Sequence, residues 1–205
     1  MKTKPIQDAD SSIAITLPSV IHRLDVAALF PALQPLEVEL GSGDGSFLIQ
    51  YAGEHRDRNF IGVERLLGRV RKTDRKANRL GLANIRLARI EASYFLQYLI
   101  PANSIEALHL YFPDPWPKRK HRKNRLVSKQ FPELLKGSLA SGGKIYLRTD
   151  DADYFEQMKS VFAAAPFFQE IPTPDDLANV LTDFERRFLK QNIQTHRAAY
   201  QLTAL

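Results

Sequence analysis

Short apolar runs alternate with segments of helical periodicity along most of the chain. The apolar runs predict strands at 36–40, 59–63, 84–88, 104–111, 144–148, 167–171 and 193–202. Helical spacing and end signals predict helices at 25–30, 46–52, 65–80, 126–139 and 151–162, with a last short helix from Thr182. Residues 1–20 are polar or mixed and carry prolines that interrupt any period, which predicts a loosely held arm.

Local signals add detail at several of these elements. Leu66, Leu67 and Val70 are expected along one side of the helix 65–80. Prolines and paired aspartates predict a loop over 172–176, and Asn192 is expected to adopt the left-handed conformation after the last helix.

The stretch FPDPWPKRKHRKNR, residues 112–125, breaks the alternation. Its three prolines at alternate positions fix the backbone and remove donors, so we predict a rigid loop rather than a helix or a central strand. The loop follows the strand 104–111 and therefore presents Asp114 at a strand's carboxyl end, where open α/β sheets bind ligands. Trp116 offers a stacking surface, and a run of cations follows. A solvated charge run is the alternative, but the prolines favour a site that holds a carboxylate still.

A second candidate site begins where the strand 36–40 runs into Gly41-Ser42-Gly43-Asp44-Gly45 and then a helix. This arrangement opens a nucleotide-binding βαβ unit, in which Gly41, Gly43 and Gly45 let the backbone pass close under a ligand. An ordinary tight turn is the structural alternative. Glu64 ends the next strand, where an acid accepts the hydroxyls of an adenosine ribose.

Charge separates the two cofactor classes that use this geometry, the dinucleotides and S-adenosylmethionine. Glu39 and Asp44 would repel a diphosphate, and Ser46 stands where GxGxxG carries its third glycine. S-adenosylmethionine instead carries a sulfonium and an ammonium, which suit these carboxylates. Glu91 follows the third strand, where such folds contact adenine. The residues favour the methyl donor.

Composition limits the remaining chemistry. The 205 residues carry a net charge of +6 and 44% hydrophobic residues, which is typical of one globular core with a polyanionic partner such as nucleic acid. The absence of cysteine excludes disulfides, thiolate metal sites and a thiol nucleophile, and five scattered histidines give no support to a metal site. No apolar run approaches the roughly 20 residues that cross a bilayer, and the amino terminus lacks the apolar core of a signal peptide. We therefore expect a cytoplasmic protein.

Together these motifs resemble the bacterial tRNA (guanine-N7-)-methyltransferases. The resemblance runs from about Leu36 to Tyr200 and rests on VELGSGDG, FIGVE, YFPDPWPKRKHRKNRL, Thr149-Asp150 and TDFE at 182–185. It implies one Rossmann-like class I methyltransferase domain over 1–205, a doubly wound α/β fold with a mostly parallel seven-stranded sheet and an antiparallel last strand. It also implies S-adenosylmethionine-dependent methylation of guanine N7 in tRNA, at position 46 in the variable loop.

The resemblance carries site roles onto matching residues. Asp114 is the implied catalytic residue. The implied contacts to S-adenosylmethionine are Glu39, Glu64, Glu91 and Asp114, beside the glycines Gly41, Gly43 and Gly45. The implied guanosine-binding residues are Lys118, Asp150, Thr182, Asp183, Phe184 and Glu185. The cations expected to contact the RNA backbone are Arg119, Lys120, Arg122, Lys123 and Arg125.

Three positions depart from the family pattern, which usually has a larger residue at Ser42, an aspartate at Glu91 and a cation at Asp183. We expect Asp183 to face solvent. Two motifs also have structural explanations. Thr182 with Glu185 forms a capping box, and either Asp150 or Asp151 can cap the helix that follows.

Guanine N7 carries a lone pair and no proton, so alignment and electrostatics suffice for methyl transfer, in agreement with the missing cysteine. Two other functions stay open. Methylation of an exocyclic amino group is one, because PDPW resembles the DPPY-type loops of those enzymes. A tRNA-binding protein without catalysis is the other, although Glu39, Glu64 and the glycines count against it. The chain leaves open whether the protein is a monomer or a homodimer.

Overall fold

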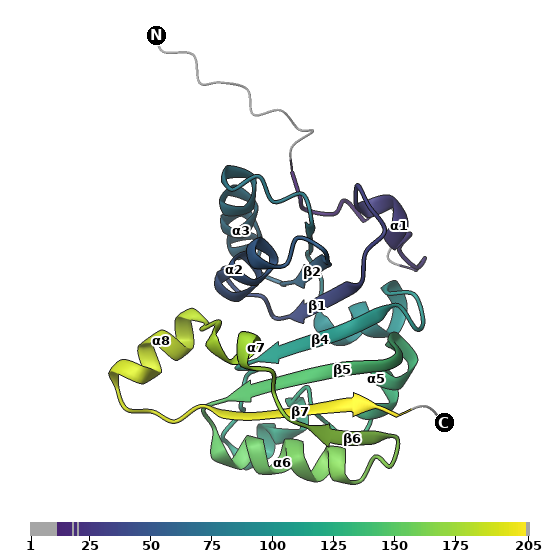
Figure 1. Cartoon of the computed structure of the whole chain (residues 1–205). Helices are drawn as coiled ribbons and strands as arrows, with labels where there is room; N and C mark the ends of the chain where they lie inside the picture. Colours follow the sequence, from purple (N-terminus) through teal and green to yellow (C-terminus); the bar gives the residue numbers. More distant parts are fainter. Residues whose placement is uncertain (1–11, 18, 20, 204–205) are drawn as a thin grey trace.

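One sheet organises the computed structural model, which describes residues 12–17, 19 and 21–203 (Figure 1). Its strands are β1 (Leu36–Leu40), β2 (Asn59–Val63), β3 (Ile85–Ala88), β4 (Ile105–Tyr111), β5 (Leu139–Thr149), β6 (Phe168–Ile171) and β7 (His196–Leu202). The helices are α1 (Val26–Leu29), α2 (Ser46–Glu54), α3 (Leu67–Arg79), α4 (Ala92–Tyr94), α5 (Phe131–Ser138), α6 (Ala152–Ala163), α7 (Asp175–Asn179) and α8 (Asp183–Lys190). A π-helix, η2 (Phe95–Leu99), and a 3-10 helix, η3 (Arg119–Asn124), complete the described elements.

The seven described strands lie in the order β3-β2-β1-β4-β5-β7-β6. β1 to β5 pair in parallel, whereas β7 runs antiparallel to both β5 and β6. The chain leaves β1 towards β2 and later returns on its other side as β4, so the gap between β1 and β4 is the switch point where such sheets bind ligands. The predicted doubly wound, mostly parallel sheet is confirmed.

Helices cover both faces of the sheet because each presents apolar residues on one side. In α2, Phe47, Leu48 and Tyr51 follow a helical period and pack in the same cluster as residues of α3 and α7. In α6, Tyr154 and Met158 pack in the cluster on the opposite face, with residues of α5 and η2. None of the helices in the described part of the chain has the length and apolar character of a membrane span.

Several boundaries differ from the sequence predictions. α5 begins at Phe131 rather than at Leu126, because Pro132 lacks the N–H that a continuing helix needs and fits only a first turn. β5 begins at Leu139 rather than at Lys144, and its pairing with β4 shifts register before the second half of the strand. The predicted loop at 172–176 contains the start of the short helix α7.

The basic helix α3 also packs differently from the expected pattern. Leu66 lies just before the helix and is 49% exposed, and Leu67 is 37% exposed, so these leucines do not form a buried side with Val70. The buried side consists of Val70, Thr73 and Ala77, whose spacing follows the helical period.

The predicted arm at 1–20 is held to the sheet in its described part. Ile15 N–H donates to the Leu87 carbonyl at 2.8 Å, and Leu87 N–H donates to the Ile13 carbonyl at 2.9 Å. Ile13 is buried, so the expectation of a loose arm is wrong for this segment. Residues 1–11, 18 and 20 of the predicted arm lie outside the described residues.

The third glycine of the turn before α2 generates a stability prediction. Gly45 has a φ of 74°, and a Cβ there would lie 2.4 Å from Thr73 Cγ2 of α3. Gly81 has a φ of 61°, but a Cβ would meet nothing within 4 Å. We expect Gly81→Ala to cost roughly 1–2 kcal/mol for the left-handed backbone alone, and Gly45→Ala to cost about 1–3 kcal/mol more from overpacking. Urea unfolding of both variants checks this, and equal losses would contradict the packing role.

Candidate active site

The carboxyl ends of β1, β2 and β4 open onto a cleft of about 1080 Å³. Gly41, Glu64, Glu91 and Asp114 all line it, although they come from four separate segments. Its size exceeds that of an ordinary small-molecule pocket of about 300–1,000 Å³, so it has room for a nucleoside and a second ligand. The predicted residues Glu39, Gly43, Gly45, Asp150 and Thr182–Glu185 do not line this cleft.

Asp114 lies between two residues in an unusual backbone conformation. Phe112 has a φ of 50° and Trp116 a φ of 46°, which bulky side chains rarely adopt. Each such residue costs on the order of 1–3 kcal/mol, and such strain concentrates at functional sites. Asp114 itself is exposed, and Phe112 N–H donates to the Arg148 carbonyl at 2.8 Å. The stretch predicted as a loop over 112–125 is irregular only as far as Lys118, because the 3-10 helix η3 occupies Arg119–Asn124.

Arg125 holds this loop to α6 and does not join the exposed cations. Its Nε donates to the Pro115 carbonyl at 2.7 Å, and its other nitrogens donate to Gln157 at 2.8 Å and Asp153 at 2.6 Å. The side chain is buried over the Tyr154 ring. The structure therefore gives Arg125 an internal role in place of the RNA contact that the sequence predicted.

The remaining cations of the loop do face outward. Lys118, Arg119, Lys120 and Lys123 are exposed, and Lys123 lines the mouth of the cleft. Arg122 is also exposed but forms an ion pair with Asp153 at 3.0 Å.

Two predicted donor-site acids are already hydrogen-bonded. Glu64 accepts from the backbone N–H of Gly43 at 3.1 Å and of Leu66 at 2.7 Å, which fixes its carboxylate at the end of β2. Glu91 caps α4 and accepts from the backbone N–H of Ser93 and Tyr94. Partial burial raises the pKa of Glu91, but these hydrogen bonds outweigh burial and bring it below the ordinary value.

The glycines of the turn divide into two roles. A Cβ at Gly41 would meet nothing within 4 Å, and one at Gly43 would meet only a carbonyl at 3.9 Å. The space above these two glycines is therefore open to a ligand. Gly45 instead packs against Thr73, so its role is contact with α3 rather than with a cofactor.

Glu39 is a buried carboxyl whose environment is incompletely satisfied. Burial raises its pKa to about 8; the Arg148 charge lowers it, while Asp44 and Glu64 raise it further. Among the described residues, neither Glu39 Oε2 nor Ser42 Oγ has a hydrogen-bond partner. A buried acceptor without a partner suits a cationic ligand with N–H donors.

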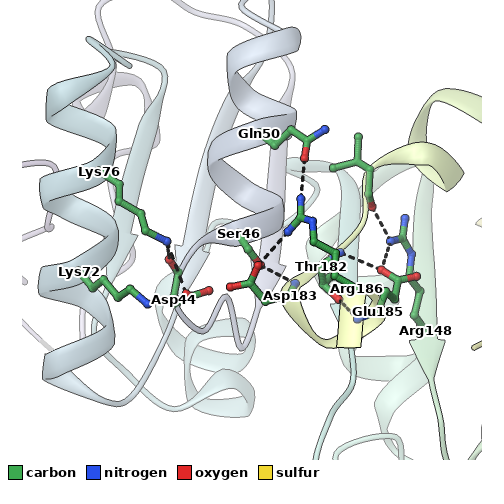
Figure 2. A network of polar contacts seen from close by, with 11 residues as sticks. Asp44, Ser46, Gln50, Lys72, Lys76, Arg148, Thr182, Asp183, Glu185 and Arg186 are labelled. Carbon is green, nitrogen blue, oxygen red and sulfur yellow. Dashed lines mark hydrogen bonds and ion pairs between the residues drawn. The ribbon is translucent and has the colours of Figure 1, made fainter. Parts of the chain in front are cut away.

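Asp44 differs from Glu39 because α3 supplies its counter-ions. Lys72 Nζ lies 2.8 Å from Asp44 Oδ2, and Lys76 Nζ donates to the Asp44 carbonyl at 3.0 Å (Figure 2). Partial burial raises the pKa of Asp44, but the hydrogen bond from Lys72 and the charge of Lys76 outweigh burial and lower it to about 2. Repulsion of a diphosphate by Asp44 is therefore offset, a pairing that the charge argument from sequence missed.

The segment Thr182–Glu185 lies beside the cleft and forms the predicted capping box. Thr182 Oγ1 accepts from Glu185 N–H at 3.1 Å, and Glu185 Oε2 accepts from Thr182 N–H at 3.0 Å. Glu185 is buried and also accepts from Arg148 at 2.8 Å (Figure 2). Arg197 donates to its other carboxylate oxygen at 2.8 Å. Its carboxylate is thus committed to internal contacts.

Other predicted substrate residues are more accessible. Phe184 is 48% exposed and stacks on Phe112 with ring centroids 5.8 Å apart. Asp151 caps α6, which leaves Asp150 exposed at the end of β5. The side chain of Asp183 is half exposed and pairs with Arg186, so it faces solvent in part, as expected, while its backbone N–H donates to Ser46 of α2.

Sequence reasoning missed Arg148. This arginine is 1% exposed and donates to the carbonyls of Leu177 and Val180 at 2.5 and 2.8 Å, in addition to Glu185. The signal was available, since a lone arginine in the apolar strand KIYLRT needs buried partners. In the described part of the chain, no group of three or more histidine, aspartate or glutamate side chains is arranged to hold a metal.

Comparison with known proteins assigns the family. Residues 33–198 match a family model described as a putative methyltransferase. The tRNA (guanine-N(7)-)-methyltransferase of Halorhodospira halophila is 34% identical over 186 residues, covering 87% of this chain and 80% of that protein. That of Sodalis glossinidius is 36% identical over 169 residues, covering 80% and 71%. The chain belongs to the tRNA (guanine-N(7)-)-methyltransferase family.

Solved structures place this family member in a wider fold class. An antibiotic-resistance methyltransferase, Kmr, is similar with a TM-score of 0.61 at 18% identity, over 88% of this chain and 92% of that chain. The 16S rRNA methyltransferase KamB gives a TM-score of 0.60 at 16% identity, over 83% and 89%. At these low sequence identities, the two structures show that the fold is shared and nothing further.

Burial of Glu39 makes a prediction about stability against pH. Its folded-state pKa of about 8 lies above its ordinary value of 4.5, so stability from this group is complete below 4.5 and is lost as pH rises through 8. We expect Glu39→Gln to stabilise the ligand-free fold relative to wild type by roughly 3–4 kcal/mol more at pH 8 than at pH 5. Urea unfolding at both pH values checks this. The exposed Glu54→Gln variant serves as the control, and a pH-independent difference would contradict the burial argument.

Proposed function

We propose that this protein transfers the methyl group of S-adenosylmethionine to N7 of a guanosine in tRNA, within the cleft between β1 and β4. One observation carries the proposal. Asp114, in the loop after β4, lines the same cleft as Gly41 and Glu64, and a residue with positive φ lies on each side of it, Phe112 and Trp116. Family membership supplies the substrate class. The target at position 46 in the variable loop is part of the proposal and rests on the sequence resemblance alone.

The residues of the cleft fit S-adenosylmethionine, which supplies an electrophilic methyl group on a sulfonium. Glu64 stands at the end of β2 with its carboxylate held by two backbone amides, where it can accept from the ribose hydroxyls. Glu39 does not line the cleft itself, but it lies two residues before Gly41, and a cation bound near that glycine would favour the ionised form of its carboxyl. Open space above Gly41 leaves room for the methionine part, and Glu91 borders the expected adenine position.

Asp114 acts on the acceptor base in this proposal. Guanine N7 attacks with its own lone pair, the sulfur–methyl bond breaks with its electrons going to sulfur, and the ring becomes positively charged. No proton leaves N7, so the protein needs no general base. Asp114 can accept from the N–H edge of guanine and offset the charge that develops on the ring, which is electrostatic stabilisation by a preorganised group.

The exposed cations next to this loop suit the phosphates of the RNA. Lys118, Arg119, Lys120 and Lys123 lie on or just before η3, immediately after the Asp114 loop. Phosphate contacts of this kind position a nucleic acid without reading its sequence. Phe184 and Asp150, exposed near the same edge of the sheet, complete the proposed acceptor surface.

Replacing Asp114 tests its catalytic role. We expect Asp114→Asn to lower the single-turnover methylation rate about 100- to 1,000-fold, with a much smaller effect on binding of donor or tRNA. Mass spectrometry of the nucleosides identifies the methylated atom, and the exposed Asp57→Asn variant is a matched control. The wild-type rate should show a plateau from neutral to alkaline pH. An alkaline rise that the substitution abolishes would instead favour methylation of an amino group.

Removing two loop cations tests the RNA surface. We expect the double variant Arg119→Ala/Lys123→Ala to flatten the slope of log affinity against log salt by about 0.7–0.9 for each phosphate that the protein no longer neutralises. Filter binding of tRNA at several salt concentrations measures the slope. The double variant Lys136→Ala/Lys144→Ala removes the same charge near the opposite edge of the sheet and should leave the slope unchanged. The same slope for both double variants would mean that the loop is only a solvated surface.

A further inference from the structure

Polar side chains join the start of α8 to the first turns of α2 (Figure 2). Asp183 N–H donates to Ser46 Oγ at 3.1 Å. Arg186 Nη2 donates to Gln50 Oε1 at 3.1 Å, while its Nη1 donates to Asp183 Oδ1 at 2.8 Å. We name Ser46, Gln50, Asp183 and Arg186 the α2–α8 contact. Neither Ser46 nor Arg186 has a role in the proposed chemistry.

The α2–α8 contact is adjacent in sequence to both proposed binding regions, the glycine turn for the methyl donor and Phe184 for the RNA. Ser46 is the first residue of α2 and follows the glycine turn, whose Gly41 lines the cleft. Asp183 is the first residue of α8 and precedes Phe184, which belongs to the proposed acceptor surface. The contact therefore bridges the donor side and the acceptor side of the site.

The position of α8 is also tied to the catalytic loop and to the sheet. Phe184 and Phe188 contact Phe112, with ring centroids 5.8 and 5.4 Å away, and Phe112 begins the loop that carries Asp114. Arg148 of β5 donates to Glu185, which ties the start of α8 to the sheet. Because α8 touches the loop and the sheet as well as α2, a shift at any one of these places changes the geometry of the acceptor surface.

Lysine and arginine side chains around the α2–α8 contact offset the charges of two neighbouring carboxylates. Asp44 and Asp183 lie near each other, and two carboxylates so placed repel each other (Figure 2). Lys72 and Lys76 pair with Asp44, and Arg186 pairs with Asp183. These three cations outnumber the two carboxylates and offset the repulsion between them.

We propose that Ser46 and Arg186 are positioning residues that couple binding of the methyl donor to binding of the RNA acceptor. The inference rests on the proposed function. A donor that orders the glycine turn also orders the start of α8 through Ser46, and RNA bound at α8 orders the turn in return. Such coupling is reciprocal, because each ligand must change the other's affinity by the same factor.

Binding measurements test the coupling without turnover. S-adenosylhomocysteine, the demethylated product, serves as the probe, and calorimetry gives its Kd with and without saturating unmodified tRNA. We expect tRNA to tighten the probe by roughly fivefold or more in the wild type. Ser46→Ala and Arg186→Ala should each nearly abolish this factor, while both ligands still bind separately with little change. Ser46→Thr keeps the hydroxyl and should restore the factor.

The control and the kinetics separate positioning from a general structural effect. Lys190→Ala removes an exposed cation from the same helix and should leave the coupling factor intact. In the two test variants, KM for tRNA should depend less on donor concentration than in the wild type, while kcat at saturation of both substrates changes little. A fall in kcat with a matching loss of thermal stability would overturn the positioning role.

The remaining outcomes distinguish the two proposals. An undiminished coupling factor in both alanine variants, or no coupling in a wild type that methylates guanine N7, overturns the inference and leaves the proposed function standing. A wild type that binds donor and tRNA but methylates no guanosine overturns the proposed function. The binding factor then still decides whether the α2–α8 contact couples the two sites.

Discussion

Backbone hydrogen bonds between β1 and β4 set the geometry on which the site depends. Their parallel register places Leu40 opposite Leu110, so Gly41 and Tyr111 emerge side by side at the carboxyl edge of the sheet. On the other side of β1, Leu40 pairs with Val63, which brings Glu64 to the same level. Because these paired strands end level with one another, the loops that carry the proposed chemistry begin at the same edge of the sheet. Side chains from these loops therefore line one cleft.

A buried charge organises the other half of the site. Arg148 is the second-last residue of β5 and is buried, so an unpaired guanidinium there would be strongly destabilising. Glu185 and the carbonyls of Leu177 and Val180 satisfy it, which draws α7 and the start of α8 onto the sheet. The TDFE motif therefore combines a structural role with the proposed contact to the RNA. Its glutamate compensates Arg148 and caps the helix, while Phe184 remains exposed towards the acceptor side.

The two proposed ligands meet protein surfaces of opposite character. On the donor side, acids remain close to the cleft, and Glu39 stays buried with an oxygen that no described residue satisfies. On the acceptor side, exposed lysines and arginines surround the Asp114 loop. Phe112 and Trp116, which have positive φ, lie in the loop between these two surfaces. The buried Arg125 anchors this loop to α6. A cationic donor and a polyanionic acceptor can thus approach the same carboxylate from different sides.

Local sequence alone determined the features that depend on neighbouring residues. β1 has the predicted bounds because Pro35 and Gly41 delimit it, and β2 because it is a short, mostly apolar run. The Thr182 capping box needs only residues three apart. The left-handed Asn192 is local in the same sense. The family motifs likewise identified Glu64 and Asp114, which line the cleft, although Glu39 from the same motifs does not.

Tertiary structure decided the features that depend on distant partners. Arg125 belongs to the interior because Gln157 and Asp153 reach it from α6, and Asp44 is neutralised because lysines reach it from α3. The raised pKa of Glu39 follows from burial under elements that arrive later in the chain. Residue type and local spacing specify what a side chain can do, whereas its solvation and its partners exist only once the sheet has brought remote segments together.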